Sequence, residues 1–186
     1  MRIEPLDLHG LMLISPALHK DVRGWFSETW SAPRLAAAGL DVAFLQDNHS
    51  YSIRAGPLRG LHYQAPPRAQ AKLVRCTRGA VRDVAVDARR GSPTFGRWVA
   101  VELSADNHRQ LLIPAGFLHG FVTLTDGSEV QYKCSDIYAP DCDGAVRWDS
   151  LGIDWGLPGD PILSGKDAAA PAFADWTTPF VWEGAA

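Results

Sequence analysis

Two polar side chains stand on strand faces that are otherwise apolar, which is where a β protein would hold chemistry inside a pocket. Lys72 falls on the apolar face of residues 72–77 and Tyr132 on that of residues 129–138, because side chains alternate along a strand with period two. An ammonium can stabilise developing negative charge, and a phenol can deliver a proton. Each also has an ordinary explanation, a rim lysine with its charge in water or a core tyrosine bonded to backbone.

Two histidines offer proton transfer or metal binding. His62 shares a strand face with Leu58 and Gly60, and an imidazole, with a pKa near ~6.5, is a natural base at neutral pH. His119 ends a Pro-x-Gly-x-x-His turn that resembles the second half of the cupin signature. A lone strand histidine is also a common structural residue, so neither position is decisive by itself.

The ligand count argues against a metal. The first half of the cupin signature would add a His-x-His pair and a glutamate, but Tyr63 and Gln64 follow His62, and no glutamate comes soon after. A catalytic metal usually needs three protein ligands. We therefore predict a cupin-like barrel that works without a metal or other cofactor.

Many short segments rich in Val, Ile, Leu and aromatic residues, separated by glycine and proline, must position these side chains. About ten strands without β-α-β alternation predict an all-β fold, a cupin-like jelly-roll barrel with short peripheral helices, as one domain over residues 1–186. The predicted strands are residues 10–15, 23–29, 43–52, 58–63, 72–77, 80–87, 97–103, 109–113, 120–124 and 129–138.

One helix is predicted after the second of these segments. Ser31 can cap it, Pro33 suits its first turn, and Gly39 can end it. From Asp141 onward the sequence is rich in Gly, Pro, Asp and Trp and has little periodicity. We expect short turns and helices there, packed on the barrel.

Bulk properties narrow the class of protein. The 186 residues are 46% hydrophobic and 21% charged with a net charge of −3, which argues against a general nucleic-acid binder but not against an anionic substrate. Residues 11–14 are too short an apolar stretch to span a membrane, and no signal peptide is recognisable. The sparse cysteines Cys76, Cys134 and Cys142 form no C-x-x-C pair. The sequence therefore predicts a cytoplasmic protein with free thiols and no membrane partner.

Several segments together resemble the dTDP-4-dehydrorhamnose 3,5-epimerase family. Residues 21–28 carry its Asp-x-Arg-Gly-x-Phe-x-Glu pattern. The resemblance continues, in order, through residues 46–52, 58–64, 66–67, 69–74, 83–87, 91–96, 132–138 and 163–167. It covers nearly the whole chain, and the combination is far more specific than any single segment.

The resemblance implies epimerisation of a nucleotide-linked 4-keto-6-deoxyhexose at the two carbons beside its ketone. It makes His62 the base, Asp167 its partner, Lys72 the group that stabilises the enolate, and Tyr132 the acid on the opposite side of the ring. Taken alone, Asp167 is better explained as a turn residue beside Lys166. The resemblance also places substrate contacts at Arg23, Glu28, Gln46, Asn48, Arg59, Lys72, His119, Asp143 and Lys166, and it implies a homodimer in which N-terminal strands join the partner's sheet.

Spacing raises one geometric difficulty. Arg59 and His62 are three residues apart, so a regular strand would point them to opposite faces. Either a bulge or turn near Gly60 rotates the chain, or Arg59 serves another part of the site, for example across a dimer. The sequence leaves both open.

Departures from the family pattern concern fine substrate choice. Lys20 stands where many members carry an uncharged residue, Asp143 is shorter than the usual glutamate, and Pro57 and Leu118 also differ. The alternatives to a 3,5-epimerase are a mono-epimerase of the same family, a metal-dependent cupin oxygenase or isomerase, and a non-catalytic sugar-binding cupin.

Overall fold

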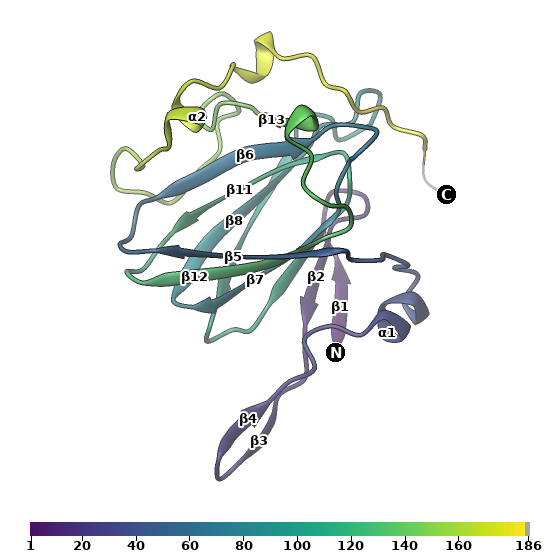
Figure 1. Ribbon diagram of the computed structural model, residues 1–186, viewed down its shortest axis with the longest axis vertical. Coiled ribbons are helices and arrows are strands. Elements are labelled where there is room, and N and C mark those ends of the chain that lie inside the picture. Colours follow the sequence, from purple (N-terminus) through teal and green to yellow (C-terminus); the bar gives the residue numbers. More distant parts are fainter. Residues whose placement is uncertain (185–186) are drawn as a thin grey trace.

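Two antiparallel sheets face each other in the computed structural model, which describes residues 1–184 (Figure 1). The six-stranded sheet has the order β1-β2-β10-β7-β12-β5, and the five-stranded sheet has the order β13-β6-β11-β8-β9. The strands are β1 (Arg2–Pro5), β2 (Met12–Ser15), β5 (Gln46–Ser52), β6 (Leu58–Gln64), β7 (Lys72–Arg78), β8 (Ala80–Asp87), β9 (Trp98–Ser104), β10 (Gln110–Ile113), β11 (Phe117–Thr123), β12 (Ser128–Cys134) and β13 (Asp143–Ala145). This arrangement confirms the predicted all-β jelly-roll fold.

The core lies between the two sheets. Alternate residues of each strand point inward, so apolar side chains from both sheets meet there, among them Val74, Leu111 and Val130 from one sheet and Val81 and Leu103 from the other. Burying such side chains stabilises the fold by roughly 1.5–3 kcal/mol each. A cavity that holds water or a polar ligand is therefore expected where polar side chains interrupt the apolar rows.

The outer faces of the two sheets are covered differently. The C-terminal segment packs Trp155 and Phe180 against the outside of the five-stranded sheet, so β8 and β11 are buried on both faces. On the six-stranded sheet, helix α1 (Ala32–Ala37) places Leu35 against Leu73 and Leu112 over part of the outer face. The rest of that face stays polar.

A two-stranded hairpin, β3 (His19–Asp21) and β4 (Gly24–Phe26), extends away from the barrel (Figure 1). Its apolar residues are largely exposed, with Val22 at 104%, Trp25 at 57% and Phe26 at 69% relative accessibility. The predicted strand at residues 23–29 was wrong in its extent, because β4 begins after the turn at residues 22–23 and already ends at Phe26.

Most predicted strands are present within a few residues of their expected ends, and the predicted helix begins next to Ser31. The Ser31 side chain makes no capping hydrogen bond, however. The prediction missed the short strands β1, β3 and β13, whose three or four residues are too few to display alternation. The expected short helices of the tail are η1 (Pro140–Cys142), α2 (Gly165–Ala168) and η2 (Phe173–Asp175).

The N-terminal strands expected to join a partner's sheet pair within the chain itself, since β2 lies between β1 and β10. The outer edge of β1 pairs with no other strand among residues 1–184. No helix among residues 1–184 is long and apolar enough to cross a membrane.

Candidate active site

A cavity of about 370 Å³ opens between the two sheets, where the polar side chains interrupt the core. His62, Lys72 and Tyr132 line it, and the same three line an adjoining hollow of about 210 Å³. His62 comes from β6 of the five-stranded sheet, while Lys72 and Tyr132 come from β7 and β12 of the other. The interior therefore presents an imidazole from one sheet to an ammonium and a phenol from the opposite sheet.

Asp167 holds the His62 ring. The carboxylate Oδ1 lies 2.5 Å from His62 Nε2, and Asp167 itself is 2% exposed. Ser164 caps α2 and fixes the other oxygen, because its hydroxyl donates to Oδ2 at 2.8 Å while accepting from the Asp167 amide. Burial raises the pKa of Asp167, but the bonds from His62 and Ser164, with the charges of His62 and Lys166, outweigh it and lower the pKa below its ordinary value. The carboxylate is thus held ionised beside the imidazole.

Burial shifts the pKa values of Lys72 and Tyr132 in opposite directions. Loss of solvent lowers the pKa of the Lys72 ammonium, against the attraction of Cys134, Asp83 and Asp143. Loss of solvent raises the pKa of the Tyr132 phenol. At neutral pH the phenol keeps its proton. No hydrogen-bond partner for Lys72 Nζ or the Tyr132 hydroxyl occurs among residues 1–184, so both polar ends are free to face a ligand.

A bulge in β6 resolves the difficulty over Arg59 and His62. His119 of β11 pairs with His62, but Phe121, two residues on, pairs with Arg59, so β6 has one extra residue there. Gly60 permits this: its φ is +135°, and a Cβ at this position would lie 2.5 Å from the Gly120 Cα. Arg59 and His62 consequently line the same cavity, which confirms the first of the two interpretations.

His119 also lines the cavity, and it has a partner that sequence reasoning missed. Asp83 of β8 is completely buried, and both of its carboxylate oxygens lie 3.0 Å from His119 Nε2. A signal was present in the sequence, since an aspartate inside the apolar run of residues 80–87 contradicts the burial of that strand. Asp83 is also the first residue of 83–87, one of the segments that resemble the family.

The adjoining hollow collects four more of the expected substrate contacts. Gln46 donates to Asn48 Oδ1 at 3.0 Å, and Lys166 forms an ion pair with Asp143, which also accepts from the Tyr138 hydroxyl at 3.2 Å. The set therefore offers amides, a charged pair and an exposed aromatic ring at one end of the cavity.

Arg23 and Glu28 are not brought to this cavity within the chain. Arg23 lies at the tip of the β3–β4 hairpin and pairs with Asp21, and Glu28 pairs with Arg34 of α1 at 3.0 Å. The structure thus assembles every expected site residue except these two.

The positions that depart from the family pattern lie in different surroundings. Pro57 lines the main cavity, while Lys20 is exposed on the hairpin. Leu118 is fully buried on the far side of β11, against the C-terminal cover. Of these three, only Pro57 touches the space where a substrate would bind within the chain.

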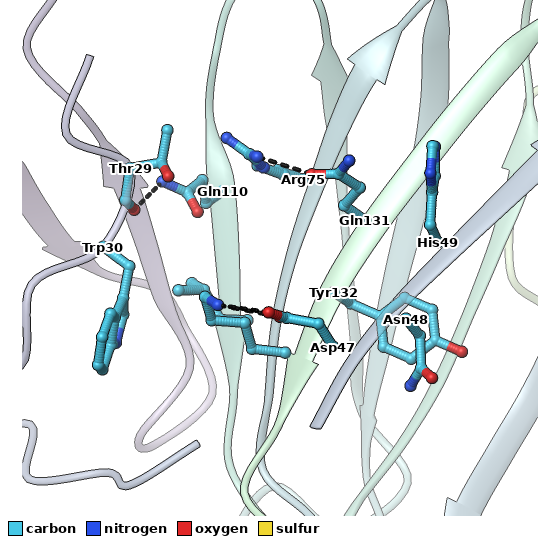
Figure 2. A pocket seen from close by; sticks show the side chains of 11 residues that line it. Thr29, Trp30, Asp47, Asn48, His49, Arg75, Gln110, Gln131 and Tyr132 are labelled. Carbon is cyan, nitrogen blue, oxygen red and sulfur yellow. Dashed lines mark hydrogen bonds and ion pairs between the residues drawn. The ribbon is translucent and has the colours of Figure 1, made fainter. Parts of the chain in front are cut away.

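A separate hollow of about 270 Å³, here called the outer pocket, lies on the other side of β7, β12 and β5 (Figure 2). Figure 2 shows the Tyr132 ring pointing away from Arg75 and Gln131, whose side chains face Thr29 and Trp30 across the outer pocket. Tyr132 and Asn48 also line this pocket, so it shares a wall with the adjoining inner hollow at these two residues. Among residues 1–184 no group of three or more His, Cys, Asp and Glu side chains is arranged to hold a metal ion.

Comparisons with known proteins agree with this arrangement. The family model described as dTDP-4-dehydrorhamnose 3,5-epimerase matches residues 5–175. The dTDP-4-dehydrorhamnose 3,5-epimerase of Pseudomonas aeruginosa is 50% identical over 178 residues, covering 94% of this chain and 97% of that protein.

Two solved structures are also similar. The dTDP-6-deoxy-D-glucose-3,5-epimerase of Legionella pneumophila, in complex with dTDP-4-keto-L-rhamnose, is 42% identical with a TM-score of 0.93, over 97% of this chain and 98% of that one. The dTDP-4-dehydrorhamnose 3,5-epimerase of Bacillus anthracis, with TDP and PPi bound, is 44% identical with a TM-score of 0.90, over 92% and 99%.

Proposed function

The chain belongs to the dTDP-4-dehydrorhamnose 3,5-epimerase family, and from this premise we propose that it inverts C-3 and C-5 of a dTDP-4-keto-6-deoxyhexose. The protein is an isomerase, and its substrate is a nucleotide sugar. The reaction must break a C–H bond beside the ketone and form a new one on the opposite face of the ring. Each step has a candidate group in the cavity.

His62 is the proposed base. Removal of the C-5 or C-3 proton leaves the bonding electrons in an enolate, with negative charge on the oxygen at C-4, and places the proton on the imidazole. The ionised Asp167 bound to His62 Nε2 orients the ring and stabilises its charged form. General-base catalysis of this kind contributes about 10²–10⁴-fold to a rate.

Lys72 and Tyr132 complete the step from the opposite sheet. The Lys72 ammonium stabilises the enolate oxygen, and the Tyr132 phenol gives its proton to the carbon from the face opposite His62. The phenolate then regains a proton from solvent and His62 releases its own. Repetition at the second carbon completes the double inversion, with no net change in atoms or electrons.

The remaining cavity residues are proposed to hold the rest of the substrate. Arg59 is suited to a phosphate oxygen by forked donation, with His119 close to the sugar. The adjoining hollow offers Gln46, Asn48, Asp143 and Lys166 to the nucleotide end. The observation that carries the proposal is that His62 and Tyr132, from opposite sheets, line one cavity together with Lys72.

Solvent deuterium tests the reaction directly. The purified protein is incubated in deuterated water with dTDP-4-keto-6-deoxyglucose, and NMR measures label at each carbon. We expect deuterium at both C-3 and C-5, together with inverted product. A His62→Ala variant with wild-type melting temperature should give neither label. Absence of label with the wild type would refute the proposal, and label at a single carbon would establish a mono-epimerase instead.

We further propose that the protein acts as a homodimer in the cytoplasm. The exposed apolar hairpin would lose its water contacts against a second copy, which also gives Arg23 and Glu28 a role at the partner's cavity. The free thiols Cys76, Cys134 and Cys142 suit a reducing compartment.

Light scattering tests the dimer. The wild type should show twice the chain mass, and a Val22→Asp/Phe26→Asp variant should dissociate and lose turnover. The matched control Ile53→Asp, at another exposed apolar position, should remain dimeric. A wild type that is monomeric at assay concentration would contradict this proposal.

A further inference from the structure

Asp83 is a buried carboxylate with few hydrogen-bond partners. It is 0% exposed, and among residues 1–184 the only side-chain partner of its two oxygens is His119 Nε2. Burying a carboxylate is costly unless its charge is balanced. Asp83 therefore needs an explanation beyond packing.

A second aspartate on the same strand shows what a structural carboxylate receives. Asp87, four residues further along β8, is equally buried, but it accepts from the Arg89 guanidinium at 2.8 Å and from the hydroxyls of Ser92 and Thr94 at 2.6 Å. These three partners balance the charge of Asp87, and none of them lines the cavity. Asp83 instead bonds to a single ring, that of His119, which lines the cavity.

We propose that Asp83 is a positioning residue for the epimerisation, which fixes the His119 ring at the wall of the cavity and supplies a buried negative charge that balances the Lys72 ammonium. The inference rests on the proposed function. It assigns to the cavity a second His–Asp pair beside the first, since His119 and His62 are directly opposed on neighbouring strands. Asp167 serves the base, whereas Asp83 serves the groups that face the enolate oxygen.

The charges around Lys72 predict that Asp83 has a measurable effect on the pKa of the Lys72 ammonium. Burial lowers the pKa of Lys72, Asp83 opposes that change together with Cys134 and Asp143, and Lys166 reinforces it. His62, His119 and Tyr132 are the other titratable groups besides Asp167 that face the cavity, and none of them changes its residue type in an Asp83 variant. Neutralising Asp83 should therefore lower the pKa of Lys72 further, and the ammonium should lose its proton at a lower pH.

An Asp83→Asn variant keeps the shape of the side chain and removes its charge. We expect kcat to fall by about 10–100-fold with KM changed less than about threefold, because loss of a group that stabilises the transition state acts mainly on turnover. The alkaline limb of the kcat profile should move to lower pH. The control, Asp87→Asn, should lower the melting temperature and leave that limb in place.

Unchanged kcat and an unchanged alkaline limb in Asp83→Asn would overturn the inference, as would an equal shift in Asp87→Asn. If Asp83→Asn does not fold, ¹⁵N NMR of the wild-type histidines decides: His119 Nε2 should carry a hydrogen-bonded proton, and an unprotonated Nε2 would refute the pairing. The Lys72 side chain can be titrated by NMR in wild type and variant without any turnover. This readout separates failure of the inference from failure of the proposed epimerase activity.

Discussion

The inner and outer faces of the strands β7, β12 and β5 are built from neighbouring residues, yet they differ in how their polar groups are satisfied. On the outer face Arg75 donates to Gln131 at 2.7 Å, and Lys133 pairs with Asp47 at 2.9 Å. On the inner face Lys72 and Tyr132 have no side-chain partner within residues 1–184. Among residues 1–184 the indole N–H of Trp30, which lines the outer pocket, is the one fully buried side-chain nitrogen or oxygen without a hydrogen-bond partner.

This difference in hydrogen bonding distinguishes two hollows whose volumes are similar. The outer pocket is about 270 Å³ and the cavity between the sheets about 370 Å³. The Trp30 indole N–H can only donate a hydrogen bond, whereas the ammonium and phenol that are free on the inner face can also stabilise charge and transfer protons. The comparison therefore predicts that turnover depends on inner-face residues and is nearly independent of their outer-face neighbours.

Tyr132→Phe should have the largest effect. Removing the hydroxyl leaves the base in place but takes away the proton donor on the opposite face, so inversion should fall by about 10³-fold. Deuterium should still enter at the reacting carbons with retained configuration, because His62 can return an exchanged proton to the face it came from. NMR and product analysis measure the two processes separately.

The control for this variant is Tyr51→Phe, which removes an exposed phenol from β5 and should leave inversion at the wild-type rate. Normal inversion in Tyr132→Phe would show that another acid serves the reaction and that the inner face has been wrongly interpreted.

Lys72→Met should reduce kcat by about 10²–10³-fold, since one donor to a developing oxyanion has that value in comparable sites. The pH profile gives a second test. Burial lowers the pKa of Lys72 and raises that of Tyr132, so in the wild type the alkaline loss of activity follows Lys72 deprotonation. In Lys72→Met that limb should move to higher pH, where Tyr132 loses its proton.

Lys133→Met, one residue beyond Tyr132 but on the outer face, is the matched control. It should leave both kcat and the alkaline limb close to wild type, because its ammonium is already paired with Asp47. Equal losses of kcat in Lys72→Met and Lys133→Met would show that the inner and outer faces do not differ in their importance for turnover.

Ser164→Ala tests the support of the His–Asp pair. The variant loses the hydroxyl that holds Asp167 Oδ2, so the carboxylate can turn away from His62, and turnover should fall by about tenfold. Loss of the helix cap should also cost about 1 kcal/mol of stability. The control Ser150→Ala removes a serine that donates to the Arg147 carbonyl and accepts from the Phe173 amide without lining the cavity. It should lower stability alone, and a matching loss of turnover there would contradict the assignment.

Most of the strands and the inner-face positions of Lys72 and Tyr132 could be predicted from the sequence, because both follow from alternation with period two. The sequence offered the bulge at Gly60 as only one of two possibilities, because the bulge depends on close approach to Gly120 of another strand. Spacing could not bring Asp167 to His62, which is 105 residues away; that pairing came from the family resemblance. Contacts between distant segments are decided by the whole packed fold.

The hairpin and Asp83 show two further limits of prediction from the sequence. The exposed residues of the hairpin look like any strand in the sequence, and only the structure shows that nothing in residues 1–184 covers Val22 and Phe26. Asp83 was readable as a polar residue in an apolar strand, but its importance depends on His119 lying beside it. A charge in a core segment is informative only once its partner is known.

Gln131→Leu should have the smallest effect and is the most direct test of the outer face. Gln131 is adjacent to Tyr132 in β12, so the change lies one residue from the proposed acid but on the far side of the strand. We expect kcat and KM within about twofold of wild type, with a change in stability within about 1 kcal/mol from the lost bond to Arg75. Steady-state kinetics and thermal melting measure both. A tenfold loss of turnover with an unchanged melting temperature would mean that the outer face communicates with the cavity through Tyr132, because a purely structural defect would lower stability as well.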